Sequence, residues 1–216
     1  MRLVFLDVDG VLNSVLFWLK QRSKGISSIN CICEPIKNLD PHCVDLLHIF
    51  INNTNSKIVL TSTWRKDPKF FFNNETEEEK IKIIKSWFKK FGWKDFPLIG
   101  LTPNLSGFRG EEVATYLDNS KEEIDDYIIL DDGDDFIQSF NTIPIHTLDK
   151  IGLINEKERN NKSQYWQNQK LYLVNKETGL THNDLIQLLK IWEPNNKILI
   201  DHNDSVKEQK RLGKYW

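Results

Sequence analysis

The sequence predicts an α/β fold, a sandwich of helices around a mainly parallel sheet, and three observations lead to this prediction. Short, continuously apolar runs, typical of strands buried on both faces, alternate along the chain with amphipathic stretches. No internal repeat and no linker rich in Pro, Gly or Ser divides the chain. Its 216 residues suit one domain, with or without insertions. Strand–helix–strand units of this kind pair their strands in parallel, so we expect helices on both faces of one sheet.

The strands are predicted from the apolar runs, taken in chain order. The first run covers 3–6 and is followed directly by an aspartate. Later runs at 58–60 and 127–130 have the same uninterrupted apolar character, and 98–99 is a shorter candidate. Continuous burial on both faces is the property of central strands in a parallel sheet.

The helices are predicted from their start signals. Asp40 followed by Pro41 is typical of an N-cap and a first helical position. Thr76 and Glu79 form a capping-box pattern ahead of apolar residues at helical spacing, which predicts a helix to about Gly92.

Two further helices follow in the second half of the chain. Gly110 precedes an acid-led helix expected over 111 to about 117, because acidic side chains favour a first turn. Thr181 and Asp184 repeat the capping pattern ahead of a final helix that extends to residue 192. The tail from residue 193 to 216 is mixed in character and is assigned to no element.

Composition limits the class of protein. Hydrophobic residues make up 39%, charged residues 28% and aromatic residues 11% of the chain, which is too apolar and too aromatic for a disordered protein. The 29 basic and 31 acidic residues nearly cancel, so no global basic field favours nucleic acid or anionic membrane. No apolar run approaches the roughly 18 residues of a membrane span. We expect a cytoplasmic monomer, with secretion by a bacterium into a host cell as the alternative location.

The cysteines are few. Cys31 and Cys33, together with His42 and Cys43, offer a zinc-binding alternative, but the spacing C-x-C followed by adjacent His and Cys fits zinc sites poorly. An odd number of cysteines also argues against a disulfide framework. We therefore expect ordinary reduced thiols.

Three polar segments follow three of the predicted strands. They are DVDGV at 7–11, TSTWR at 61–65 and DDGDD at 131–135. Each has a commonplace interpretation as a turn, a cap or a solvated acidic cluster. Ligand sites of parallel sheets lie at the carboxyl ends of the strands, so the three segments are expected to converge. Carboxylates packed together require a compensating cation, and hard oxygen ligands with phosphate chemistry favour Mg²⁺.

These motifs resemble the haloacid dehalogenase (HAD) superfamily of aspartate-based phosphatases. Further runs resemble its capless branch, the HAD domain of Swiss Army Knife RNA repair proteins: IGLTP at 99–103, RGEEV at 109–113, IILDD at 128–132 and ETGLT at 177–181. The resemblance covers roughly residues 1 to 192. It implies one HAD-like phosphatase domain over 1–192, a Rossmann-like three-layer sandwich with little or no cap domain.

The resemblance also implies roles for individual residues. Asp7 would be the nucleophile that forms an aspartyl-phosphate, and Asp9 the general acid and base. Thr61 would hydrogen-bond the phosphoryl oxygens, with Ser62 as the alternative. Where the family usually has a lysine that neutralises the phosphoryl group, this chain has Arg109.

Metal and substrate residues complete the expected site. Asp132 is the first choice for the metal ligand of the third strand, with Asp131 and Asp135 as supporting candidates, and Asp9 would add its main-chain carbonyl to the ligands offered by Asp7. The expected substrate-binding residues are Gly10, Ser62, Trp64 and Arg65, and Lys66 or Arg65 are alternatives to Arg109 as the neutralising cation.

An open site favours a phosphate that protrudes from a macromolecule. The net acidity of the chain favours a phosphoprotein, for example one carrying phosphotyrosine, over nucleic acid. The alternatives are a nucleic-acid end phosphatase and, in another class, a non-catalytic phosphate-binding module. The presence of both Asp7 and Asp9 favours catalysis over binding alone.

Overall fold

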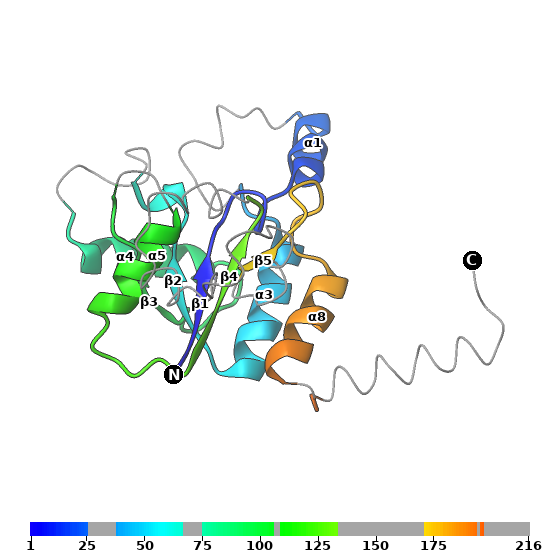
Figure 1. Ribbon diagram of the computed structural model, residues 1–216. Coiled ribbons are helices and arrows are strands. Elements are labelled where there is room, and N and C mark those ends of the chain that lie inside the picture. Colours follow the sequence, from blue (N-terminus) through cyan, green and yellow to red (C-terminus); the bar gives the residue numbers. More distant parts are fainter. Residues whose placement is uncertain (26–37, 67–74, 106–108, 134–170, 194, 197–216) are drawn as a thin grey trace, which may run out of the picture.

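The computed structural model describes residues 1–25, 38–66, 75–105, 109–133, 171–193 and 195–196. In these residues five strands form one sheet in the order β3-β2-β1-β4-β5, and every neighbouring pair is parallel (Figure 1). The strands are β1 (Arg2–Leu6), β2 (Lys57–Leu60), β3 (Leu98–Leu101), β4 (Asp126–Asp131) and β5 (Leu171–Leu173). The predicted α/β fold with a mainly parallel sheet is confirmed.

In the described part of the chain, five α-helices and one short 3-10 turn accompany the sheet. They are α1 (Val15–Ser23), α3 (Pro41–Thr54), η2 (Thr63–Lys66), α4 (Glu77–Lys89), α5 (Arg109–Asn119) and α8 (His182–Trp192). The predicted start signals are real: Asp40 accepts a hydrogen bond from the His42 amide at 3.0 Å, and the capping boxes that begin at Thr76 and Thr181 are both formed.

The strands bury both faces, and their residues alternate between two clusters. Val4 and Leu6 of β1 belong to the cluster that packs under α3, α4 and α8. Leu3 and Phe5 face the opposite way, toward Val113 and the rest of α5. Figure 1 shows α3 and α8 side by side, and the helices and sheet form the three expected layers.

Two elements were not predicted, α1 and β5. In α1 all of the first five residues are apolar, so no helical period is visible, and Val15, Leu16 and Leu19 remain exposed. In β5 only three residues pair with β4, which is too short a run to produce a strand pattern. Helix α5 begins at Arg109, two residues before the expected start.

Two connections lie on the side of the sheet formed by β1, β2 and β3. The described residues between β1 and β2 form α1 and α3, and those between β2 and β3 form η2 and α4. The chain left over in these connections, 26–37 and 67–74, is too short for a further domain. None of the described helices has the length and apolarity to cross a membrane. The proposed domain boundary at 192 coincides with the end of α8 and stays a prediction. The assignment of 193–216 to a tail also stays a prediction, because 194 and 197–216 lie outside the described residues.

Candidate active site

Three aspartates meet at the carboxyl ends of the central strands. Asp7 follows β1, Asp131 ends β4 and Asp132 comes next in the chain. Strands β1 and β4 pair with Leu6 opposite Leu130, and the Asp7 amide donates to the Leu130 carbonyl at 2.9 Å, so the first two carboxylates are brought together by the register of the sheet. One oxygen from each of the three carboxylates lies within 4.8 Å of the others.

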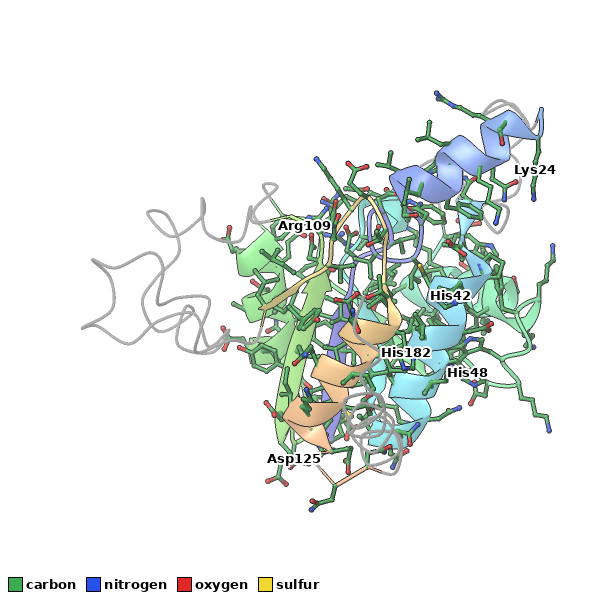
Figure 2. All side chains as sticks on the ribbon, turned by 90° about the vertical axis from the view of Figure 1, so that its right-hand side faces the viewer. Lys24, His42, His48, Arg109, Asp125 and His182 are labelled. Atoms are coloured by element: carbon green, nitrogen blue, oxygen red, sulfur yellow. The ribbon has the colours of Figure 1, made fainter. Side chains whose placement is uncertain are left out.

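Arg109, the first residue of α5, lies against this cluster. Its Nη1 atom is 3.1 Å from Asp7 Oδ2 and also donates to Asp131 Oδ2. Figure 2 shows Arg109 at the upper end of the sheet and Asp125 at the lower end. The three carboxylates and the one guanidinium together have a formal charge of −2. Burial is the largest cause that raises the pKa of Asp132, and the negative charge of Asp7 is the next.

Buried polar atoms without partners mark the same edge of the sheet. Among the described residues, Thr61 Oγ1 and Asp7 Oδ1 are buried and have no hydrogen-bond partner. Thr61 is positioned beside Asp7 because its amide continues the β1–β2 ladder to the Leu6 carbonyl at 2.9 Å. A buried polar group left unsatisfied costs about 1–3 kcal/mol, so these atoms are suited to a ligand.

The hydroxyl of Ser62 is used differently from that of Thr61. Ser62 Oγ accepts a hydrogen bond from the Trp64 amide at 3.3 Å and so begins the 3-10 turn η2. Of the two hydroxyls left open by the sequence, the one of Thr61 is presented at the cluster without a partner in the described structure.

The carboxylate of Asp9 is held by two donors. Asn13 Nδ2 donates to Oδ1 at 2.8 Å, and Trp64 Nε1 donates to Oδ2 at 2.9 Å. Asn13 in turn accepts from the Gly10 amide at 2.9 Å, which closes the loop after β1. Loss of water around the carboxyl is the largest cause that raises the pKa of Asp9, and the charge of Asp7 adds to it.

Trp64 is a buried residue of the core. Its side chain is only 6% exposed, and its indole orients Asp9 from inside the core. Little of the ring is left exposed and its indole N–H is donated to Asp9, so the substrate contact expected of Trp64 stays a prediction. Asn13, the other partner of Asp9, was missed, since an Asn after an Asp-Gly turn resembles an ordinary loop residue.

Gly10 is required by both backbone conformation and space. Its φ angle is +77°, in the left-handed region that favours glycine, and a Cβ atom built there would lie 2.3 Å from Cγ of Asp132. The turn after β1 thus touches the side chain after β4 directly. Gly10 shapes the carboxylate cluster through this close approach.

Arg65 is occupied by the protein itself. All five of its N–H groups are donated: to the carbonyls of Thr61, Ser62, Thr102 and Pro103, and to the carboxylate of Glu112. The Arg65 and Glu112 side chains are 4% and 2% exposed. Every N–H donor of Arg65 is thus used within the protein, and the substrate-binding role expected for it stays a prediction.

The three candidates for the neutralising cation have different partners. Lys66 Nζ pairs with Glu112 Oε1 at 3.0 Å, beside Arg65, while Arg109 is the cation in contact with Asp7 in the described structure. Glu112 itself was missed, because an acidic residue in the first turn of a helix is indistinguishable by sequence from one that only favours the helix dipole.

Some predicted residues are not placed. Asp135 lies outside the described residues, as do Cys31 and Cys33, so the zinc alternative has two of its four ligands outside them. Cys43 is buried, its thiol donates to the Leu180 carbonyl at 3.4 Å, and burial raises its pKa to about 12. Such a thiol is a core residue and an unreactive one.

The cluster fits a hard divalent cation by its chemistry. It offers carboxylate oxygens, the ligands that Mg²⁺ prefers, and two uncompensated negative charges beside unpartnered buried atoms. The sequence also matches a known protein family. A family model described as the HAD domain in Swiss Army Knife RNA repair proteins matches residues 3–185. No curated protein and no solved structure matches the chain.

Proposed function

The chain belongs to the family of HAD domains in Swiss Army Knife RNA repair proteins, and from this premise we propose that it is an Mg²⁺-dependent phosphomonoester hydrolase. Membership of the HAD family points to phosphatase chemistry. The observation that carries the proposal is the convergence of Asp7, Asp131 and Asp132 within 4.8 Å, with Arg109 against them.

The metal would be held by the carboxylates of Asp7, Asp131 and Asp132, with the main-chain carbonyl of Asp9 as a further ligand. When bound, Mg²⁺ supplies positive charge that offsets the repulsion among the carboxylates and polarises the phosphoryl group.

In the proposed first step, a carboxylate oxygen of Asp7 attacks the phosphorus atom, and the bond from phosphorus to the leaving oxygen breaks. Asp9 donates its proton to that leaving oxygen, so the alcohol departs neutral and Asp7 carries the phosphoryl group. The raised pKa of Asp9 favours the protonated form that this step needs. Thr61 Oγ1 donates a hydrogen bond to a phosphoryl oxygen, and Arg109 offsets the negative charge.

In the second step, the ionised Asp9 takes a proton from a water molecule as the water oxygen attacks phosphorus. The bond between phosphorus and the Asp7 oxygen breaks, which releases inorganic phosphate and restores the Asp7 carboxylate. Asp9 is protonated again at the end of the cycle. The hydrogen bonds from Asn13 and Trp64 keep its carboxyl oriented through both steps.

We propose the terminal phosphate of a nucleic-acid strand as the substrate. The family is named for RNA repair, and the described residues between β1 and β3 add only helices and a 3-10 turn to the sheet. The overall charge of −2, which favours a phosphoprotein, is a sum over the chain and does not describe the surface next to the site. A phosphoprotein is kept as the alternative outcome of the substrate comparison.

The test is hydrolysis of p-nitrophenyl phosphate with Mg²⁺ and with EDTA, by the parent chain and by Asp7→Asn. We expect metal-dependent turnover that falls about 10³-fold or more in Asp7→Asn, because the nucleophile is lost. Asp45→Asn, an exposed acidic residue on α3, is the matched control and should retain activity.

The same assay then compares oligonucleotides with a terminal phosphate against phosphotyrosine and phosphoserine peptides. Preference for the oligonucleotides supports the proposed substrate, and preference for a peptide overturns it. Absence of turnover on all substrates, from folded protein with Mg²⁺ bound, would overturn the phosphatase proposal in favour of a phosphate-binding module.

A further inference from the structure

A groove of about 550 Å³ lies between α1 and the start of α3. One wall is a single face of α1, formed by residues at helical spacing: Phe17, Lys20, Gln21 and Lys24. The opposite wall includes Pro41 and His42 of α3, and Figure 2 shows Lys24 at the tip of α1 and His42 at the upper end of α3. No function assigned above uses this groove.

The main chain connects the groove to the loop after β1, residues 7–13, which contains Asp7 and Asp9. Helix α1 begins one residue after Ser14, which lines the groove and follows Asn13, the partner of Asp9. The amides of Val15 and Leu16 donate to the carbonyls of Lys176 and Glu177, both at 3.1 Å. One end of the groove is therefore joined through Ser14 to the loop that carries Asp9, and the first turn of its α1 wall is held in place.

The loop after β5 fastens this arrangement to the core. The Leu180 amide donates to the Val11 carbonyl at 2.9 Å. Gly179, with φ of +67°, passes so close that a Cβ atom would lie 2.8 Å from Cys43 Sγ and 3.0 Å from the Val11 carbonyl. The ETGLT run at 177–181 thus serves to clamp the start of α1 beside the catalytic loop.

The charge of this surface is positive although the chain as a whole is acidic. Helix α1 contains no acidic residue, and the exposed side chains of Lys20, Arg22 and Lys24 lie in or just beyond its last turn. The acidic residue that lines the groove, Asp40, turns Oδ1 to the His42 amide as the helix cap. The two lysines in the groove therefore attract a ligand with repeated negative charge.

Aromatic and apolar surface accompanies the basic side chains. The indole of Trp18 is half-buried on α1 and packs edge-on against Phe17, and the neighbouring Leu16 and Leu19 are exposed. Cations that follow the sugar-phosphate backbone are one component of single-strand recognition. A phosphopeptide carries one phosphate, whereas a polynucleotide carries a negative charge at every residue, so the paired lysines favour the polynucleotide.

We propose that the groove between α1 and α3 binds the phosphodiester backbone of a single-stranded nucleic acid next to its terminal phosphate, with Lys20 and Lys24 as the backbone contacts. This inference rests on the proposed function for the terminal phosphate and extends it to a binding site outside the catalytic residues. Its ligand class is a single strand of RNA or DNA.

The decisive variant is Lys20→Ala/Lys24→Ala, measured on a phosphate-ended 12-mer RNA and on p-nitrophenyl phosphate. We expect the ratio of kcat/KM for RNA to kcat/KM for the small substrate to fall about tenfold. The slope of log Kd against log salt concentration should weaken by about 1.4, because each single-strand phosphate contact contributes about 0.7. The matched control is Lys89→Ala/Lys90→Ala, exposed lysines at the far end of α4, which should leave the ratio unchanged.

Binding of the same RNA to the parent chain and to the double variant is also measured by fluorescence anisotropy. EDTA is present, so that the RNA is bound without being hydrolysed. If the parent chain fails to hydrolyse p-nitrophenyl phosphate, the proposed function fails, while a tenfold loss of RNA affinity in the double variant still supports the groove. The groove proposal is overturned if the parent chain and the Lys20→Ala/Lys24→Ala variant bind RNA with the same affinity. It is equally overturned if affinity for a phosphotyrosyl peptide falls as far as affinity for RNA, since the groove would then be a general anion surface.

Discussion

At the residue scale, the aspartates were predictable because each follows a buried strand and the ends of parallel strands meet. Asp7 and Asp131 needed only the strand pattern and the parallel pairing to be placed together. The contacts of Arg65 and Glu112 were not predictable, because 47 positions separate them and no local pattern indicates which buried acid neutralises a given arginine. Tertiary structure alone decides such pairs.

Gly10 offers a prediction with a matched control. Gly10→Ala introduces both a strained φ and a Cβ clash with Asp132, whereas Gly25→Ala, with φ of +75° and open space around it, introduces only the strain. We expect Gly25→Ala to cost about 1 kcal/mol of unfolding free energy and Gly10→Ala about 1–3 kcal/mol more, with loss of Mg²⁺-dependent activity. Urea unfolding measures both values, and equal losses in the two variants would contradict the close approach.

Trp64 offers a second residue-scale prediction. Trp64→Phe keeps a buried ring but removes the donor to Asp9, so kcat should fall about tenfold with little change in KM, because the acid is less well oriented. Trp192→Phe is the matched control, since Trp192 Nε1 makes the same bond, at 2.9 Å, to Asp126 at the opposite end of the strands. Equal kcat values in the two variants would contradict a positioning role for Trp64.

At the element scale, the pair of Arg65 and Glu112 joins three elements, because it connects η2, the end of β3 and the first turn of α5. Arg109 lies one helical turn before Glu112, so the same pair sets the position of the guanidinium that contacts Asp7. Helix α5 thus presents one residue to the catalytic site and anchors itself with another.

The buried ion pair of Arg65 and Glu112 predicts a large effect on the free energy of unfolding. Glu112→Gln leaves a buried guanidinium without its counter-charge, and we expect a loss of about 3–5 kcal/mol of unfolding free energy. The exposed pair of Lys85 and Asp95, 3.5 Å apart, is the comparison: Asp95→Asn should cost less than about 0.5 kcal/mol. Chemical denaturation at neutral pH measures both. A small loss in Glu112→Gln would mean that the pair does not anchor α5.

Elements with caps were the most predictable. Helices α3, α4 and α8 begin at the residues their caps indicated, because a side chain that satisfies backbone amides is a local signal. Helix α1 lacks helical periodicity since its apolar residues are partly exposed, and β5 is set by pairing with β4 instead of by its own pattern. Elements of this kind depend on the rest of the fold.

At the scale of the whole molecule, metal binding and stability should be coupled. Because the carboxylates of Asp7 and Asp132 repel one another, Asp132→Asn in EDTA should be about 1 kcal/mol more stable than the parent chain. In Mg²⁺ at about 100 times its Kd the parent chain should gain about 2.7 kcal/mol and the variant far less, which reverses the order. Thermal unfolding with and without Mg²⁺ measures this, and the same order in both conditions would contradict a metal site at the cluster.

The central claim is that Asp7 becomes the phosphorylated residue. The most direct measurement is acid quenching of the chain during turnover with Mg²⁺, reduction of the acyl phosphate by borohydride, and mass spectrometry of the modified peptide. The account predicts that Asp7 alone is converted to homoserine, and that omission of substrate abolishes the conversion. Modification of another residue, or none at Asp7 while substrate is hydrolysed, would contradict it.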